Sequence, residues 1–372
     1  MSKAGYKHLG DYIRPVDVRN RDLKVTNLLG VNLSKQFFPS IANIIGTDLS
    51  KYKIVEKGQF GCKFMSVGRD GILPISLMQD DKPAIISSAY YVFEVKDQEV
   101  LIPEYLMMWL RRPEFDRQLW FYSGGDVRGG VNYDDFCEMP IIIPSITRQR
   151  EIVSEYETLT NRIRLNNQMI QHLEATAQAL YHKTFVDNID KENLPEGWRM
   201  GTLGEIATCL DYKRKPLSED ERKLIKGVYP YYGAVSVVDY INQYIFDGTY
   251  LLFSEDGVNV IDENGHPALQ YLWGKFWVNN HAHVLQGNKV VSTEYLYMAL
   301  KEVNAAHLVT GAAQPKINQE NMNSIQLIVP QKDYMEEFNK NIQPVFLLYK
   351  QKIEENVKLT ELQSLLLAKM GQ

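Results

Sequence analysis

The amino-acid sequence predicts an α+β chain in which two similar globular domains alternate with two long helices. Three observations carry this prediction. The sequence repeats itself at an offset of about half its length, the globular parts hold short β-rich segments bounded by turn residues, and each half closes with a long heptad-patterned stretch. The chain has 372 residues, which is long enough for two domains.

Four segments of the first half return in the second half in the same order. The longest runs from Gly124 to Ser145 and returns as Thr310 to Gln331. Matching order and similar offsets are hard to obtain by chance, so we expect both globular domains to share one fold. The other pairs are Leu9-Gly10-Asp11 with Leu203-Gly204-Glu205, the runs that end in Arg69-Asp70-Gly71 and Glu255-Asp256-Gly257, and Pro103-Glu104-Tyr105-Leu106 with Thr293-Glu294-Tyr295-Leu296.

Each globular domain is predicted to contain short strands around an amphipathic helix, at 103–112 in the first domain and 293–303 in the second. Pro144 and Pro330 each end an apolar strand and mark the entry to a long helix. The β-rich segments are 90–95, 140–144, 250–253 and 325–329. The predicted boundaries are 1–145 and 191–330 for the two globular domains, and 146–190 and 331–372 for the two helical segments.

The two helical segments carry the spacing of a coiled coil, with a phase slip in the second. Asn166 is a polar residue in the first stripe, of the kind that fixes register at a cost in stability. Because each helix follows its own domain, we expect an antiparallel pair of roughly 55–60 Å within the chain. An intermolecular coiled coil is the alternative. The predicted interface consists of Ile152, Leu159, Ile163, Asn166, Ile170, Leu173, Leu180, Ile342, Val345, Tyr349, Ile353, Asn356, Leu359 and Leu366.

Composition excludes several classes of protein. The hydrophobic content of 45% is ordinary for a globular protein, and no apolar run is long enough to span a membrane. The N-terminus lacks the apolar core of a signal peptide, so we expect a cytoplasmic location. The three cysteines form no CxxC pair, which argues against a disulfide framework or a cysteine-based zinc site. A net charge of −5 also argues, by itself, against DNA binding.

Familiar catalytic motifs are absent from the sequence. It contains no GxxxxGK[ST], GxGxxG, HExxH or GxSxG motif, and no Asp or Asn followed by Pro-Pro-Tyr. We therefore expect no catalytic residues in this chain. His281 and His283 have a spacing compatible with metal ligation, but a pair of histidines on a strand surface is the simpler interpretation, and no metal is predicted.

Several segments resemble a known family. They are LPEGW at 194–198, LGEI at 203–206, YPYYGA at 229–234, DYINQYIFDG at 239–248 with the following LLFSEDG, and the helical stretch from Gln149 through Asn166 to Leu180. Together, over both halves and essentially the whole chain, they resemble the DNA-specificity subunit of type I restriction–modification systems. The first domain departs from this pattern, because its start has no counterpart of LPEGW or YPYYG.

The resemblance implies that each globular domain reads one half of an interrupted DNA sequence. The helices would act as a ruler and as a platform for two modification (methyltransferase) subunits in a bacterial or archaeal cell. S-adenosylmethionine would be bound by those subunits, and ATP and Mg²⁺ by restriction subunits, so no cofactor is expected in this chain. The −5 charge then indicates that partner subunits supply most of the grip on the phosphates.

Candidate DNA-contacting residues come from local basic clusters and glycine-rich loops. Lys213, Arg214 and Lys215 interrupt an otherwise acidic domain, where phosphate attraction is most needed, although a solvated charge run is the alternative. In the last loop of the repeat, arginine can read guanine and glutamine can read adenine. The remaining candidates are Arg128, Gln314 and Lys316 in that loop, Lys63 and Arg69 around the central loop of the first domain, and Lys275 between two tryptophans.

Two other classes of function remain open at this point. The chain could be a coiled-coil scaffold that uses its duplicated domains to bind proteins. It could also be an enzyme with an unfamiliar active site. The order and duplication of the motifs favour the DNA-specificity interpretation over both.

Overall fold

The computed structural model describes residues 5–41, 46–122, 131–311 and 314–371, and the chain divides into two compact units. Unit 1 comprises residues 1–165 with 355–372, and unit 2 comprises residues 166–354. Each unit is thus a globular domain together with one half of each long helix. In both units, residues of the long helices belong to the hydrophobic core, such as Ile152 in unit 1 and Phe338 in unit 2.

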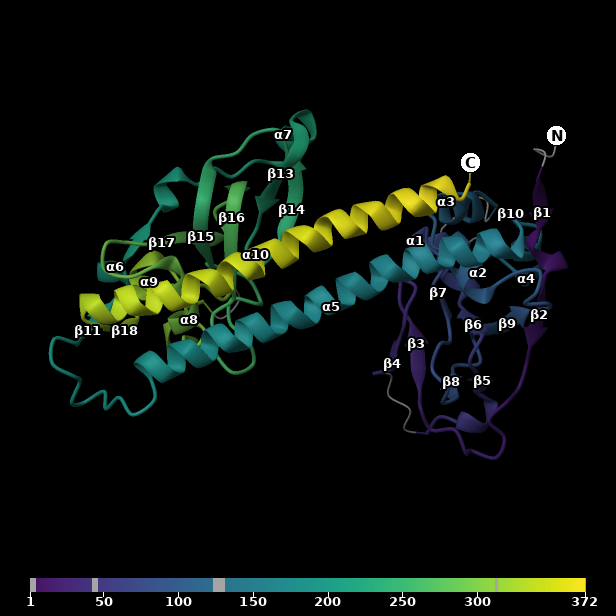
Figure 1. Cartoon of the computed structure of the whole chain (residues 1–372), viewed down its shortest axis with the longest axis horizontal. Coiled ribbons are helices and arrows are strands. Elements are labelled where there is room, and N and C mark those ends of the chain that lie inside the picture. Colours follow the sequence, from purple (N-terminus) through teal and green to yellow (C-terminus); the bar gives the residue numbers. More distant parts are fainter. Residues whose placement is uncertain (1–4, 42–45, 123–130, 312–313, 372) are drawn as a thin grey trace. The chain divides into compact units, whose positions relative to one another are not determined.

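The two long helices run antiparallel within each unit (Figure 1). In unit 1, Arg162 pairs with Glu355 at 2.6 Å. In unit 2, the rings of Phe185 and Phe338 lie 5.0 Å apart. Residue numbers therefore rise along one helix as they fall along the other. The helices are α5, Ile146–Phe185, and α10, Lys332–Lys369.

The residues predicted for the helix interface are all buried or half-buried. Ile152 belongs to the hydrophobic core of unit 1, and Ile342 to that of unit 2. Asn166 is 3% exposed. The apolar stripe of each helix therefore covers its globular domain as well as the other helix, which is why the stripe extends to the helix ends.

Unit 1 is built from short antiparallel strands. Its four-stranded sheet has the order β2-β9-β6-β7, and the pairs β1-β10, β3-β4 and β5-β8 lie outside it. The strands are β1 Tyr6–His8, β2 Ile13–Val16, β3 Leu29–Val31, β4 Phe37–Pro39, β5 Lys53–Val55, β6 Gln59–Cys62, β7 Ile75–Leu77, β8 Ala84–Ile86, β9 Tyr91–Val95 and β10 Pro140–Ile142. The short helices are α1 Val67–Asp70, α2 Pro103–Leu110, α3 Pro113–Tyr122 and α4 Tyr133–Cys137.

Unit 2 contains a six-stranded sheet with the order β12-β17-β15-β16-β13-β14, and the separate pair β11-β18. The sheet is antiparallel except where β13 pairs with β16. The strands are β11 Arg199–Thr202, β12 Ala207–Cys209, β13 Lys226–Tyr232, β14 Val237–Ile241, β15 Phe246–Ser254, β16 Leu269–Val278, β17 Ala282–Gly287 and β18 Gln326–Val329. The helices are α6 Leu203–Ile206, α7 Glu219–Leu224, α8 Thr293–Leu300 and α9 Gln319–Asn323.

The two units repeat one internal frame, which confirms the predicted duplication. The Tyr105 hydroxyl of α2 donates to the carbonyl of Ile142 at 3.0 Å, and the Tyr295 hydroxyl of α8 donates to the carbonyl of Ile328. In both units the buried helix is thus fixed to the last strand before the long helix. Matching contacts are the backbone bonds from Leu9 to Met139 and from Leu203 to Ile325, and the N-caps Asn132 of α4 and Asn318 of α9.

No helix in the described part of the chain is long and apolar enough to cross a membrane.

Candidate nucleic-acid interface

The basic segment at 213–215 directs its middle side chain into unit 2. The Arg214 side chain is 14% exposed, and its guanidinium donates to Glu255 Oε2 at 2.5 Å and to the carbonyl of Ala282 at 2.8 Å. It also pairs with Asp211 Oδ2 at 3.1 Å. Arg214 therefore makes internal contacts with three separate stretches of the chain.

Lys213 and Lys215, by contrast, are exposed. Neither ammonium pairs with a carboxylate among the residues that the structure describes. The carbonyl of Lys215 accepts a hydrogen bond from Trp277 Nε1 at 2.6 Å, which fixes the backbone beside the free side chain. The segment follows β12, the second strand of the unit. These two lysines fit a phosphate contact better than Arg214 does.

Glu255 joins this basic segment to the loop that contains Lys316. It directly follows β15, and its Oε1 accepts from Lys316 Nζ at 2.8 Å while Oε2 accepts from Arg214. The backbone reinforces the junction, because the N–H of Ile317 donates to the carbonyl of Glu255 at 2.9 Å. One buried carboxylate thus holds two candidate DNA-contacting segments.

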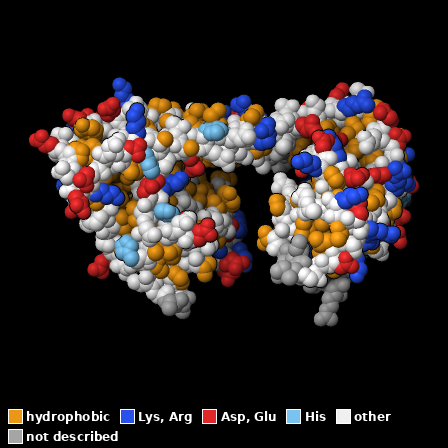
Figure 2. Space-filling view, turned by 90° about the horizontal axis from the view of Figure 1, so that it is seen from below, with side chains coloured by type: hydrophobic (Ala, Val, Ile, Leu, Met, Phe, Trp, Pro, Cys, Tyr) orange, Lys and Arg blue, Asp and Glu red, His pale blue; other side chains and the backbone are white. Residues whose placement is uncertain are grey.

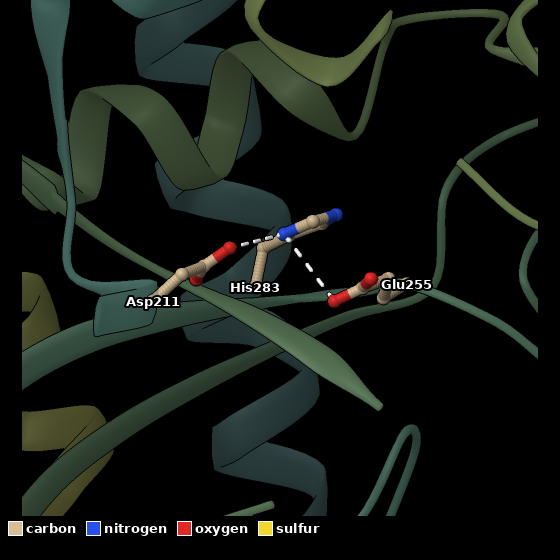
Figure 3. Close-up of side chains that lie close together, drawn as sticks. All are labelled: Asp211, Glu255 and His283. Carbon is tan, nitrogen blue, oxygen red and sulfur yellow. Dashed lines mark hydrogen bonds and ion pairs between the residues drawn. The ribbon is translucent and has the colours of Figure 1, made fainter. Parts of the chain in front are cut away.

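His283 lies between the two acidic side chains of this cluster (Figure 3). Its ring is 1% exposed, with Nδ1 2.5 Å from Asp211 Oδ2 and 3.6 Å from Glu255 Oε2. Its Nε2 lies 2.9 Å from the carbonyl oxygen of Ile317. Both ring nitrogens therefore face oxygen atoms that can accept hydrogen bonds.

The acidic groups of the cluster are held in their charged form. Burial raises the pKa of Asp211, but the hydrogen bond and charge of His283 outweigh it, so the pKa lies below its usual value. Burial acts on Glu255 in the same direction, and the hydrogen bonds from Lys316 and Arg214 again lower the pKa overall. The carboxylates are thus stabilised by the cations that surround them.

Asp211, Glu255 and His283 also have the residue types and spacing of a metal site, with one ligand atom from each within 4.8 Å of the others. The oxygens that would bind the ion already accept hydrogen bonds from Arg214, Lys316 and His283. A metal ion would have to displace these hydrogen-bond donors, so the chemistry of the cluster favours pairing with Arg214 and Lys316 over metal ligation.

The simple interpretation of His281 and His283 as surface histidines is wrong for His283. His281 is exposed and pairs with Asp256 at 2.8 Å, whereas His283 is buried. The carboxylates beside both rings come from positions 25 to 72 residues away in the sequence. Only the sheet pairing brings them together, so the spacing of the two histidines contains no signal for them.

Gln314 and Lys316 lie in unit 2 between α8 and α9. Gly311 adopts a φ of +84°, a conformation that side-chain-bearing residues rarely adopt. Thr310 and Lys316 then exchange two backbone hydrogen bonds of 2.8 and 2.9 Å. Gln314 is exposed, and the Lys316 side chain is 45% exposed despite its pairing with Glu255. Both side chains can therefore reach a ligand from a backbone that is held in place.

Lys275, on β16, has a different environment. It is exposed, and its ammonium lies 4.7 Å from the centre of the Tyr244 ring. Of the two flanking tryptophans, Trp277 is buried and Trp273 is half-buried, as expected for sheet packing. Lys275 takes no part in the ion pairs of Glu255.

In unit 1, Lys63 and Arg69 line one cavity of about 300 Å³ together with Asn32, Phe38 and Tyr90. Arg69 forms two 2.8 Å hydrogen bonds to the carboxylate of its neighbour, Asp70. The ammonium of Lys63 lies 5.7 Å from the centre of the Tyr90 ring. The structure thus brings together two residues that the sequence placed on either side of a loop.

The end of α3 carries a feature that sequence reasoning missed. Phe121 is 78% exposed, Tyr122 is 50% exposed and Trp120 is 41% exposed. The signal in the sequence is the run of three consecutive aromatic residues at 120–122. Arg128, a predicted contact, lies outside the described residues.

Charge is distributed in agreement with the overall −5 balance. On the face drawn in Figure 2, the basic and acidic side chains of the described residues are interspersed over both units, without one continuous basic surface. On this face, any attraction for an anionic ligand would come from local basic groups.

The comparisons with known proteins agree on one protein family. A model of the type I restriction modification DNA specificity domain matches residues 74–175 and 195–358. A putative type I restriction enzyme specificity subunit of Haemophilus influenzae is 30% identical over 149 residues, which cover 40% of this chain and 37% of that protein. The HindI specificity subunit of the same species is 21% identical over 97% of both chains.

The fold has a known counterpart. The crystal structure of a type I restriction–modification S subunit from M. genitalium aligns with a TM-score of 0.58 and 16% identity, over 98% of this chain and 95% of that one. The family model itself matches more than half of the chain, once in each half. The chain therefore belongs to the family of type I restriction enzyme specificity subunits and has two DNA specificity domains.

Proposed function

We propose that this chain selects the DNA site of a type I restriction–modification complex, with each unit reading one half of an interrupted sequence. Family membership favours DNA specificity over the protein-binding scaffold that the sequence also allowed. The observation that carries the proposal is the frame repeated in both units, in which a buried tyrosine fixes a helix to the last strand. Two copies of one frame suit a ligand with two similar parts.

The two frames carry different groups toward a ligand. Unit 1 offers Lys63 and Arg69 around a cavity, whereas unit 2 offers Gln314, Lys213 and Lys215. Arginine and glutamine pair preferentially with guanine and adenine edges, and lysines suit phosphates. Different groups on a shared frame support an asymmetric site, with a different sequence in each half.

The long helices are proposed to set the spacing between the half-sites and to hold two methyltransferase subunits. Apolar side chains that remain exposed on α10 support a docking role, among them Val357 at 55%, Leu362 at 50% and Leu365 at 59% exposure. S-adenosylmethionine would be bound by the methyltransferase subunits, and ATP with Mg²⁺ by restriction subunits where these are present. This chain would contribute recognition and no catalytic group.

Methylome sequencing of cells that express this chain with its methyltransferase subunit tests the proposal. The expected result is methylation at one bipartite sequence, and methylation without a bipartite sequence would overturn the two-reader proposal. Lys63→Ala should relax only one half of the site and Gln314→Ala only the other. Lys57→Ala is the control in unit 1, because Lys57 is an exposed residue that already pairs with Asp81.

The spacing role has its own test. Insertion of seven residues into α5 and seven into α10 keeps the heptad phase. The preferred spacer between the half-sites should then lengthen. An unchanged spacer in a complex that still methylates DNA would refute the ruler role.

A further inference from the structure

A cluster of polar side chains in unit 2 joins parts of the chain that are distant in sequence. It contains the carboxylates Asp211 and Glu255, with Arg214, Lys316 and His283 packed against them. Glu255 accepts from Arg214 with one oxygen and from Lys316 with the other. Arg214 and Glu255 lie 41 residues apart. The side chains of Arg214 and Glu255 are only 14% and 11% exposed, so the bridge lies largely inside the unit.

Within the bridge, Arg214 and Glu255 are largely buried and are not available for DNA, whereas residues next to the bridge are exposed. Arg214 makes further bonds to the carbonyl of Ala282 and to Asp211, so its guanidinium has little capacity left. Lys213 and Lys215, on either side of it, are exposed. At the other end of the bridge, Gln314 is exposed two residues before Lys316.

We propose that Arg214 and Glu255 are positioning residues for DNA recognition by unit 2, and that the Arg214–Glu255–Lys316 bridge holds the 213–215 segment and the 314–316 segment in one fixed arrangement. This inference rests on the proposed function. It assigns to Arg214 an indirect role in place of the direct contact that its place in a basic cluster suggested. Lys213 and Lys215 then contact phosphates in a fixed register relative to Gln314, which contacts a base edge.

The physical advantage of such a bridge is preorganisation. Two short segments that moved independently would each have to be ordered when DNA binds, and this ordering would weaken the specific complex. A shared buried carboxylate orders both segments in the free protein. Phosphate contacts fix the position of a protein on the duplex, and base readout depends on that position. Loosening the bridge should therefore reduce discrimination between bases more than it reduces general DNA binding.

Glu255→Gln gives a test in which two explanations predict opposite changes in DNA recognition. The substitution removes a negative charge, which by electrostatics alone should strengthen binding to any DNA. It also severs the bridge, because the amide nitrogen cannot accept from Lys316 or Arg214. Asp239→Asn is the matched control, since Asp239 likewise joins two cations, Arg222 and Lys226, elsewhere in unit 2.

The measurement uses the complex of this chain with its methyltransferase subunit and the duplex that the wild-type complex selects from a randomised library. Affinities are compared for that duplex and for duplexes with one base pair changed in either half-site. Glu255→Gln should lower discrimination about tenfold in the half read by unit 2, the size of a typical single mismatch effect. Discrimination in the other half, and binding to unrelated DNA, should not fall. Asp239→Asn should leave both halves unchanged.

A second variant separates positioning from loss of folding. Ile342 lies in the hydrophobic core of unit 2 and is not part of the bridge, so Ile342→Val should lower the stability of unit 2 without removing a bridge contact. If Ile342→Val reduces discrimination as much as Glu255→Gln does, the proposal is overturned. Unchanged or improved discrimination in Glu255→Gln also overturns it. If the wild-type complex shows no base discrimination in either half-site, the proposed function itself fails.

Arg214→Lys supplies an independent readout. Lysine keeps the charge but cannot reach Glu255, Asp211 and the carbonyl of Ala282 together as the guanidinium does. Discrimination in the half read by unit 2 should fall, while the salt dependence of binding to unrelated DNA stays unchanged. A salt dependence that changes with unaltered discrimination would show that Arg214 contacts phosphate directly, and this would refute the positioning role.

Discussion

The buried ion pair between Lys35 and Asp116 makes a strong prediction about unit 1. Their side chains are 6% and 11% exposed, and Lys35 Nζ lies 2.7 Å from Asp116 Oδ2. Lys35 also donates to the carbonyl of Leu110, and Asp116 Oδ1 accepts from the N–H of Leu73 at 3.1 Å. The pair thus fixes the loop between β3 and β4 to the helical part of the unit.

Asp116→Asn keeps the shape of the side chain but leaves the Lys35 ammonium buried without a counter-charge. Breaking a buried pair in this way costs about 3–5 kcal/mol. At roughly 2–4 °C per kcal/mol for a unit of this size, the melting temperature of unit 1 should fall by roughly 6–20 °C. Asp81→Asn is the control, because the pair between Lys57 and Asp81 is 62% and 87% exposed. Loss of this exposed pair should leave the melting temperature of unit 1 nearly unchanged.

The double variant Lys35→Met with Asp116→Leu tests whether an apolar pair can replace the buried ion pair. Burial lowers the pKa of Lys35 and raises that of Asp116 despite their mutual attraction. The cost of burying both charges is thus only partly offset, and an apolar pair should restore stability to near the wild-type level. Calorimetric unfolding measures all four proteins. Equal melting temperatures for Asp116→Asn and Asp81→Asn would refute the reasoning.

Three further predictions concern unit 2. The folded-state pKa values of Asp211 and Glu255 lie below their ordinary values of 3.8 and 4.5, so their stabilisation is complete above these values and is lost as the pH falls below them. Urea unfolding should show that unit 2 loses stability below about pH 4.5, and that the loss is less steep in Glu255→Gln. An identical pH profile in that variant would show that the ion pairs of Glu255 do not stabilise unit 2. Phe338→Ala removes a ring that is 1% exposed and should destabilise unit 2 by about 3–5 kcal/mol; a loss below about 1 kcal/mol in urea unfolding would show that the ring does not anchor α10. The double variant Lys213→Ala, Lys215→Ala should reduce the slope of log affinity against log salt by about 1.8, at about 0.9 per phosphate contact. Lys223→Ala, whose ammonium already pairs with Glu219, should not change that slope, and equal slopes in both variants would exclude the phosphate contacts.

The helices could be predicted because they depend on local periodicity, and the repeat could be predicted because its two copies can be compared within the sequence itself. The segments expected at 103–112 and 293–303 contain α2 and α8, and the segments expected at 146–190 and 331–372 contain α5 and α10. The same reasoning could not separate Arg214 from Lys213 and Lys215. All three residues are basic, so the sequence does not distinguish them. Arg214 is largely buried because it donates to Glu255 and Ala282, which lie far along the chain, whereas the two lysines are exposed.

The environment of His283 could not be predicted from the sequence either. A spacing of two residues places side chains on one face of a strand, but β17 begins at Ala282, so His281 precedes the strand and follows a different path. The partners of His283 come from a loop and from the end of another strand. Pairing between distant strands decided its environment, and no local pattern describes that pairing.

The division of the chain into units has a consequence for its biosynthesis. Unit 2 is continuous in sequence, whereas unit 1 is closed by residues 355–372, which leave the ribosome after all of unit 2. Met370 is 7% exposed in the core of unit 1, and the Tyr6 hydroxyl donates to the carbonyl of Gly371 at 3.4 Å. The domain that is translated first is therefore completed last. Until then, the apolar surface around Ile152 and Val153 lacks part of its cover, and nascent unit 1 depends on the successful folding of the domain inserted within it.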